Sequence, residues 1–199
     1  MRDSVTHSIP LLYPQIKDKC TEIEFSMLSD MQLGSLLKSL VASKPEGRFL
    51  ELGTGIGLAL SWMLDGMDTT SRVVSIDNDA SLIEIAKGYF EDDTRVELIC
   101  QDGGEWLRNY NGPQFDLIFA DAWPGKFFDL DVTLDHVKEG GIYIIDDMSE
   151  QSDWPEGHDQ KVINLIEELE QKQNFTMVKL NWSTGIIIMT KQKAQRDLN

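Results

Sequence analysis

Acidic side chains recur in this 199-residue chain directly after its short apolar runs. Such runs predict strands, and ligands of a parallel sheet bind beyond the carboxyl ends of its strands. Carboxylates at that edge can accept hydrogen bonds from hydroxyl and amino groups, or bind a hard cation. The acids in question are Glu51, Asp77, Asp102, Asp121, Asp146 and Asp147.

Three alternate glycines, Gly53, Gly55 and Gly57, follow the first of these runs. A strand, a glycine turn and an amphipathic helix allow a ligand to touch bare backbone. The dinucleotide fingerprint G-x-G-x-x-G would require a further glycine where Leu58 stands. Because Glu51 would repel a pyrophosphate, the turn favours an amine-bearing sulfonium nucleoside over NAD.

Asp77 ends the apolar run that starts at Arg72, 24 residues after Gly53. A carboxylate at a similar distance, one strand later, accepts hydrogen bonds from the two ribose hydroxyls in dinucleotide-binding folds. Capping of a helix that begins near Ala80 is the alternative role for Asp77. Asn78 can add a ribose or adenine contact, or can serve the turn.

The stretch from Glu51 to Gly57 resembles motif I of the class I S-adenosylmethionine (SAM) dependent methyltransferases, and Asp77 fits the acid that follows it. The resemblance implies a Rossmann-like α/β fold, a doubly wound, seven-stranded, mostly parallel sheet with a C-terminal antiparallel hairpin. It also implies SAM as the cofactor, with Thr54 in the binding turn and with Asp102 and Gly103 at the adenine. An Asx turn at a helix start is the other role for Asp102.

Apolar runs alternate with segments of helical period, which independently predicts an α/β sheet. We expect one domain over residues 1–199, with a partly helical segment at 1–28 that covers the site and a polar tail at 191–199. The predicted strands are 49–52, 72–77, 96–100, 115–120, 141–145, 176–180 and 185–190. The predicted helices are 30–41, 58–64, 80–90, 104–109 and 160–169.

Asp121, Asp146 and Asp147 follow the fourth and fifth predicted strands. Three gathered carboxylates repel one another unless a positive charge lies between them. The pattern resembles the cation-dependent O-methyltransferases of catechols and caffeoyl-CoA, which carry one Asp and an Asp-Asn pair there. The resemblance implies Mg²⁺ or another divalent cation at these three residues and an oxygen acceptor. This chain departs from the family pattern at two positions: Asp147 replaces the Asn, and Pro124 replaces a lysine.

Three residues are candidates for acceptor chemistry: Asp121, Lys126 and His158. Asp121 can orient a substrate or accept a hydrogen bond from the SAM amino group, whereas Lys126 and His158 are candidate bases. Trp123 and Trp154 can sandwich an aromatic acceptor, or can simply pack their loops.

Eighteen basic and 34 acidic residues give a net charge of −16. Such a surface disfavours nucleic acid and favours a small-molecule acceptor, which can be aromatic. The two cysteines suggest no disulfide framework, and Cys100 is expected in the core. With no signal peptide and no apolar run long enough for a membrane, we expect a cytoplasmic protein, and a homodimer is left open.

The sequence leaves three other functions open. One is a metal-independent methyltransferase with a nitrogen or carboxylate acceptor. A second is a NAD-linked oxidoreductase, against which the Leu58 mismatch argues. A third is a non-catalytic module that binds SAM and transfers nothing.

Overall fold

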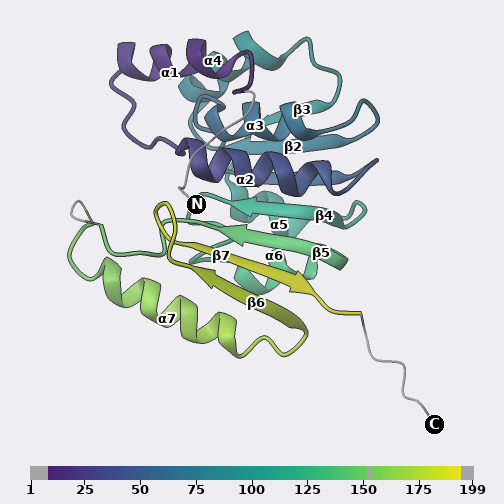
Figure 1. The fold of residues 1–199 in the computed structure, drawn as a ribbon, viewed down its shortest axis with the longest axis vertical. Coiled ribbons are helices and arrows are strands. Elements are labelled where there is room, and N and C mark those ends of the chain that lie inside the picture. Colours follow the sequence, from purple (N-terminus) through teal and green to yellow (C-terminus); the bar gives the residue numbers. More distant parts are fainter. Residues whose placement is uncertain (1–8, 152–153, 194–199) are drawn as a thin grey trace, which may run out of the picture.

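A computed structural model describes residues 9–151 and 154–193. Its seven strands form one sheet in the order β3-β2-β1-β4-β5-β7-β6 (Figure 1). The first five strands are parallel, and β7 pairs antiparallel with both β5 and β6, which confirms the predicted fold class. The strands are β1 (Arg48–Leu52), β2 (Arg72–Asp77), β3 (Val96–Cys100), β4 (Phe115–Ala120), β5 (Val137–Ile145), β6 (Phe175–Leu180) and β7 (Ile186–Lys191).

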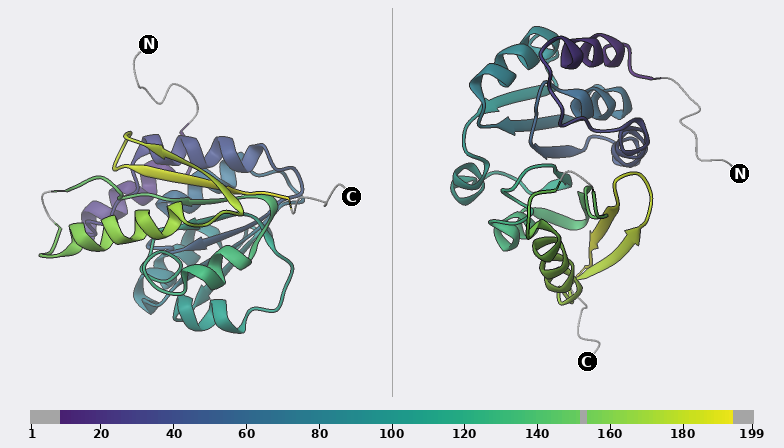
Figure 2. Two further views of the ribbon diagram at one scale, coloured as in Figure 1. Left: turned by 90° about the horizontal axis from the view of Figure 1, so that it is seen from below. Right: turned by 90° about the vertical axis from the view of Figure 1, so that its left-hand side faces the viewer.

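Helices cover both faces of the sheet (Figure 2). The first four bury apolar side chains against one face, and the last three against the other, so each face has its own core cluster. The helices are α1 (Tyr13–Glu22), α2 (Met31–Ala42), α3 (Leu58–Gly66), α4 (Ala80–Phe90), α5 (Gly103–Asn109), α6 (Leu130–Asp135) and α7 (His158–Glu170).

Aspartates fix the start of three helices. The Asp30 carboxylate accepts from two backbone N–H groups at the start of α2, and Asp79 does the same for α4. Asp102 accepts from the Glu105 N–H at the start of α5. An aspartate at this position satisfies N–H groups that have no partner within the helix, so the sequence sets where these helices begin.

The structure corrects several sequence-based expectations. Cys100 is exposed rather than in the core, because β3 is an edge strand of the sheet. Residues 1–8 of the predicted cover segment and 194–199 of the predicted tail lie outside the described residues. Lys191, where the predicted tail begins, still belongs to β7. Within the described ranges, no helix has both the length and the apolar composition that membrane crossing requires.

The order of the strands reverses between β1 and β4. From β1 the chain moves outward to β2 and β3, and from β4 it moves outward in the other direction. The two strand ends are joined where the Asp121 N–H donates to the Leu52 carbonyl oxygen at 2.8 Å. In open α/β sheets such a reversal leaves a crevice at the carboxyl edge, and ligands bind there.

Candidate active site

A cavity of about 700 Å³ lies at this reversal point. The glycine turn forms part of its wall, with Gly53 and Gly55 both lining it. Gly53 has φ 99°, a left-handed conformation that only glycine adopts readily, and a Cβ there would meet the Asp121 carbonyl oxygen. The turn therefore requires glycine because two strand ends approach each other closely.

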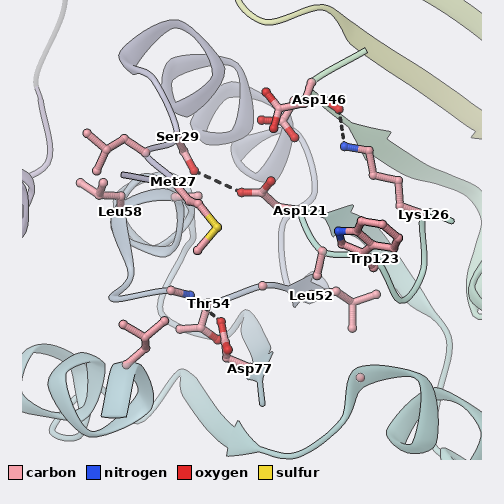
Figure 3. A pocket seen from close by; sticks show the side chains of 18 of the residues that line it. Met27, Ser29, Leu52, Thr54, Leu58, Asp77, Asp121, Trp123, Lys126 and Asp146 are labelled. Atoms are coloured by element: carbon pink, nitrogen blue, oxygen red, sulfur yellow. Dashed lines mark hydrogen bonds between the residues drawn. The ribbon is translucent and has the colours of Figure 1, made fainter. Parts of the chain in front are cut away.

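Asp77 lines the cavity beside the turn, as Figure 3 shows. Its two carboxylate oxygens accept from the Gly55 N–H at 2.8 Å and from the Asp79 N–H at 3.0 Å. Asp79, not Asp77, caps α4, so the alternative role predicted for Asp77 belongs to a residue two positions later. Each Asp77 oxygen keeps a lone pair for a further donor. Asn78 lines the same wall.

Glu51 lies behind the turn and is not among the residues that line the cavity. Its side chain is fully buried, and Ser75 Oγ donates to its Oε2, while Oε1 has no partner. A hydrogen bond of 2.6 Å links Ser75 Oγ to Thr54 Oγ1, and Thr54 does reach the cavity. Burial raises the pKa of Glu51 to about 8, opposed by Ser75 and assisted by the charge of Asp77.

Of the two residues predicted to bind adenine, Asp102 and Gly103, only one lines the cavity. Gly103 lines the cavity, whereas Asp102 is exposed and its carboxylate accepts from the Glu105 N–H at 2.7 Å. The Asp102 side chain thus serves the start of α5. Its contact with an adenine stays a prediction.

Asp121, Asp146 and Asp147 converge as predicted. Each offers a carboxylate oxygen within 4.8 Å of the others, and all three line the cavity. Asp146 is only 4% exposed, and its Oδ1 is buried without a hydrogen-bond partner. Ser29 Oγ donates to Asp121 at 3.3 Å, and Gln151 Nε2 donates to Asp147 at 2.9 Å. We call these three aspartates the acidic cluster.

The acidic cluster is electrostatically strained. Burial raises the pKa values of the Asp121 and Asp146 carboxyls, and repulsion within the cluster raises them further. Lys126 acts in the opposite direction on both carboxyls. The arrangement favours a proton, an ammonium or a metal cation among these oxygens.

Lys126 enters the cavity from the loop after β4 and is only 5% exposed. Its Nζ donates to the backbone carbonyl oxygen of Asp146 at 2.6 Å (Figure 3). Although Lys126 stands two residues beyond the position where the resemblance places a lysine, the loop carries its side chain to the acidic cluster. The structure thus brings Lys126 and the three aspartates together.

His158 is the first residue of α7 and lines the cavity among aromatic rings. Its ring centroid lies 4.7 Å from that of Trp154, 5.3 Å from that of Phe127 and 6.1 Å from that of Trp123. Its Nδ1 is buried without a partner. Burial and the charges of Lys126 and Lys161 lower the pKa of His158. The imidazole is therefore neutral at pH 7 and has a nitrogen free to accept a proton.

The profile of a family described as a methyltransferase domain matches residues 50–148. This stretch runs from the first strand, through the glycine turn and Asp77, to the acidic cluster. The chain carries a methyltransferase domain. The match confirms the resemblance to methyltransferases that the sequence motifs indicated.

Curated relatives of this methyltransferase domain come from mycobacteria. Proteins of Mycobacterium leprae and Mycobacterium avium, provisionally assigned as O-methyltransferases, are each 30% identical over 96 residues. That alignment spans 46% of this chain and 43% of each relative, less than half of their length.

Solved structures share the fold over almost the whole chain. The O-methyltransferase TomG of Streptomyces achromogenes, in complex with SAM, has a TM-score of 0.81 at 20% identity and covers 95% of this chain and 93% of its own. An O-methyltransferase of Bacillus cereus with SAH has a TM-score of 0.79 at 18% identity and 94% coverage of both chains. At identities of 20% and 18%, these likenesses establish the fold alone.

Sequence reasoning missed several residues that line the cavity. Phe25 to Asp30 border it on the side of α2, Gln151 lies in the loop after β5, and Thr184 lies in the turn between β6 and β7. Ser29 could have been found from the sequence, because it directly precedes Asp30, a residue type that favours a helix start. The others carry no motif, since only the tertiary fold brings their loops to this edge.

Substitution of Gly53 by alanine tests the glycine turn of the methyltransferase domain. We expect a loss of about 1–3 kcal/mol in the free energy of unfolding, because a side chain at φ 99° is strained and would meet the Asp121 carbonyl. Unfolding in urea measures this change in free energy. The control is Gly88→Ala within α4, where an added Cβ meets nothing within 4 Å and should stabilise by up to about 1 kcal/mol. Equal effects of both variants would contradict the prediction.

Proposed function

We propose that this protein transfers a methyl group from SAM to an oxygen atom of a small molecule. The observation that carries the proposal is one continuous cavity, lined at one side by the glycine turn and Asp77 and at another by the acidic cluster. Cofactor recognition and acceptor activation thus have residues in the same cavity. The methyltransferase domain and the SAM- and SAH-bound structural relatives support the same conclusion.

The cofactor half uses backbone and carboxylates. The turn from Gly53 to Gly57 offers bare backbone to the methionine end, and Asp77 accepts hydrogen bonds from the ribose hydroxyls. We assign Asn78 and Gly103 to the adenine side, with Asp102 behind Gly103. Glu51 and Thr54 support the turn through Ser75 rather than by a contact of Glu51 with the cavity. Bound SAM supplies an already activated methyl group, so alignment is the main task of the protein.

The acidic cluster fits a hard divalent cation such as Mg²⁺. The donors are three carboxylates, and the unpartnered Oδ1 of the buried Asp146 is an oxygen that still needs a positive partner. Asp121, Asp146 and Asp147 would hold the ion, which when bound lowers the pKa of an acceptor hydroxyl. Asp121 lies at the reversal point, where it can also orient the cofactor or the acceptor.

The acceptor half has an aromatic wall. Trp123, Phe127 and Trp154 surround His158, so a planar acceptor can stack there while its hydroxyl faces the acidic cluster. We assign His158 as the general base because its neutral imidazole has an unpartnered nitrogen. Lys126 is the other basic group at the site, and it places a positive charge beside the reacting oxygen.

One observation favours a second candidate, methyl transfer without a metal. Lys126 Nζ already brings a positive charge to the acidic cluster, where it donates to the Asp146 carbonyl oxygen. A nitrogen or carboxylate acceptor would need no cation to lose a proton. Addition of EDTA decides between the two, because it would leave the rate of the metal-independent enzyme unchanged.

Calorimetric titration with SAM and with NAD, each with and without Mg²⁺, tests the proposed function. We expect SAM to bind and NAD to give no heat. Asp77→Ala should weaken SAM binding at least about tenfold, roughly 1.4 kcal/mol, because it removes the acceptor for the ribose hydroxyls. Asp92→Ala, which removes an exposed acid in the loop after α4, is the matched control and should bind SAM normally. NAD binding, or wild-type affinity of Asp77→Ala, would reject the proposal.

The single-domain boundaries, the cytoplasmic location and the homodimer stay predictions. They need solution measurements of mass and location and do not affect the assignment of the cavity.

A further inference from the structure

Lys126 is the one basic side chain that, among the described residues, both lines the cavity and is almost fully buried. Its loop, residues 121–128, folds back so that the Gly125 N–H donates to the Phe128 carbonyl oxygen at 2.7 Å. This turn directs Lys126 inward, where Nζ donates to the Asp146 carbonyl oxygen. Burial of an ammonium without compensating charge is costly. The acidic cluster beside it supplies that compensation.

The acidic cluster in turn needs a positive charge. Neutral groups donate to two of its members, Ser29 to Asp121 and Gln151 to Asp147. Asp146 is the most buried of the three and has an oxygen without a partner. The positive charge of Lys126 acts on both Asp121 and Asp146. The lysine and the carboxylates therefore depend on each other when no other cation is present.

We propose that Lys126 is the built-in counter-cation of the acidic cluster, so that its ammonium stabilises the cluster without metal and weakens the binding of a metal cation there. The inference rests on the cation site of the proposed function. A metal ion and the ammonium are both attracted by the same carboxylates and repel each other at a site where Lys126 and Asp146 are both almost fully buried. Lys126 thus sets the cation affinity as a positioning residue. The proton of the acceptor then passes to His158.

Lys126→Met removes the charge and keeps most of the apolar stem. Two effects of opposite sign are expected. Measured in EDTA by urea unfolding, the metal-free protein becomes less stable, because the carboxylates lose their counter-cation. Measured by calorimetry without SAM, Mn²⁺ binds at least tenfold more tightly, because its competitor is gone. A lysine with a purely structural role would lower stability and would not tighten Mn²⁺ binding.

Lys126→Arg and Lys161→Met are the matched controls. The first keeps the charge and should keep the wild-type Mn²⁺ affinity within about threefold. The second removes a charge beside a residue that lines the cavity, since Lys161 Nζ lies 4.4 Å from the Trp123 ring centroid. Because Lys161 makes no hydrogen bond to the acidic cluster, its loss should also change Mn²⁺ affinity by less than threefold.

Asp147→Asn tests the proposal without depending on the folding of the lysine variant. Asp147 has φ 54°, a conformation that asparagine tolerates well, so the variant should fold. With one carboxylate fewer, the metal-free protein should gain stability, and Mn²⁺ should bind at least tenfold more weakly. The double variant with Lys126→Met and Asp147→Asn should recover, without metal, much of the stability that Lys126→Met alone loses.

Two results would overturn the proposal. One is a Lys126→Met protein that binds Mn²⁺ no more tightly than the wild type. The other is the absence of Mn²⁺ binding in every protein, which would remove the cation site as well. SAM titrations of the same samples report separately on the methyltransferase function, because Asp77 is hydrogen-bonded to the glycine turn, whereas Lys126 is hydrogen-bonded to Asp146.

Discussion

Replacement of His158 by glutamine is expected to lower kcat by about 10²- to 10⁴-fold and to leave the Kd for SAM unchanged. His158 lines the acceptor half of the cavity, and its imidazole has a nitrogen without a hydrogen-bond partner, as a base requires. Glutamine keeps a polar group of similar reach but cannot act as a base. Formation of SAH with catechol as the acceptor measures kcat, and titration with SAM measures Kd.

The pH profile separates a base from a merely structural histidine. Burial and two nearby lysines lower the pKa of His158 below its usual 6.5, so the imidazole is protonated and inactive only in acid. The wild-type kcat should therefore rise with pH through a pKa below 6.5, and this step should vanish in His158→Gln. A step from Asp121, whose pKa burial raises to about 7, should be the same in both proteins.

His136→Gln is the control for the His158 substitution. The His136 Nε2 contacts the Leu107 carbonyl oxygen at 2.9 Å, and His136 does not line the cavity. Its variant should keep the wild-type profile. A His158→Gln enzyme within threefold of the wild-type kcat would exclude His158 as the base.

Strands were predictable where the chain carries a compact apolar run. The limits of β2, β3 and β4 agree with the sequence-based ranges. β5 begins four residues earlier than predicted, at Val137, because an irregular register between β4 and β5 lets the polar stretch before Gly141 join the pairing. Pairing with a neighbour, not the composition of 137–140, decides that boundary.

Short or polar helices were harder to foresee. Helix α6 spans only Leu130–Asp135, fewer than two full turns, so its apolar residues cannot show a period. Helix α1 was expected only as part of a partly helical cover, although it buries Tyr13, Ile16 and Cys20 against the core. In both cases the packing partner, which the sequence does not show, supplies the stability.

The site was predictable to the extent that strand ends define it. Asp77, Asp121 and Asp146 were found because the carboxyl ends of parallel strands meet at one edge. The hydrogen bond from Ser29 to Asp121 joins residues 92 positions apart, which no local pattern reveals. Glu51 shows the opposite error of assuming that every acid near the edge faces the ligand. Successive strand residues point to opposite faces, and Glu51 faces the layer of α1–α4 with Phe49.

The buried position of Glu51 predicts a stability that depends on pH. Its pKa is about 8 in the folded protein and near its ordinary value of 4.5 in the unfolded chain. Between these values the folded state binds a proton that the unfolded state releases, so the contribution of Glu51 to stability falls as pH rises from 4.5 to 8. Below 4.5 the contribution is neutral. At pH 7 the penalty is roughly 3 kcal/mol.

Glu51→Gln should abolish that slope, because an amide stays neutral at every pH in the window. The free energy of unfolding, measured in urea from pH 4.5 to 8, should therefore rise for the variant relative to the wild type as pH increases. Because Oε1 has no hydrogen-bond partner, the glutamine amide is also left partly unsatisfied, at a cost in stability that does not depend on pH. This cost lowers the free energy of unfolding equally at every pH and leaves the difference in slope unchanged. Glu97→Gln, on the exposed side of edge strand β3, should follow the wild-type curve. Parallel curves for Glu51→Gln and the wild type would mean that the carboxyl behind the glycine turn is ionised throughout, with a cation or a water supplying the partner that Oε1 lacks.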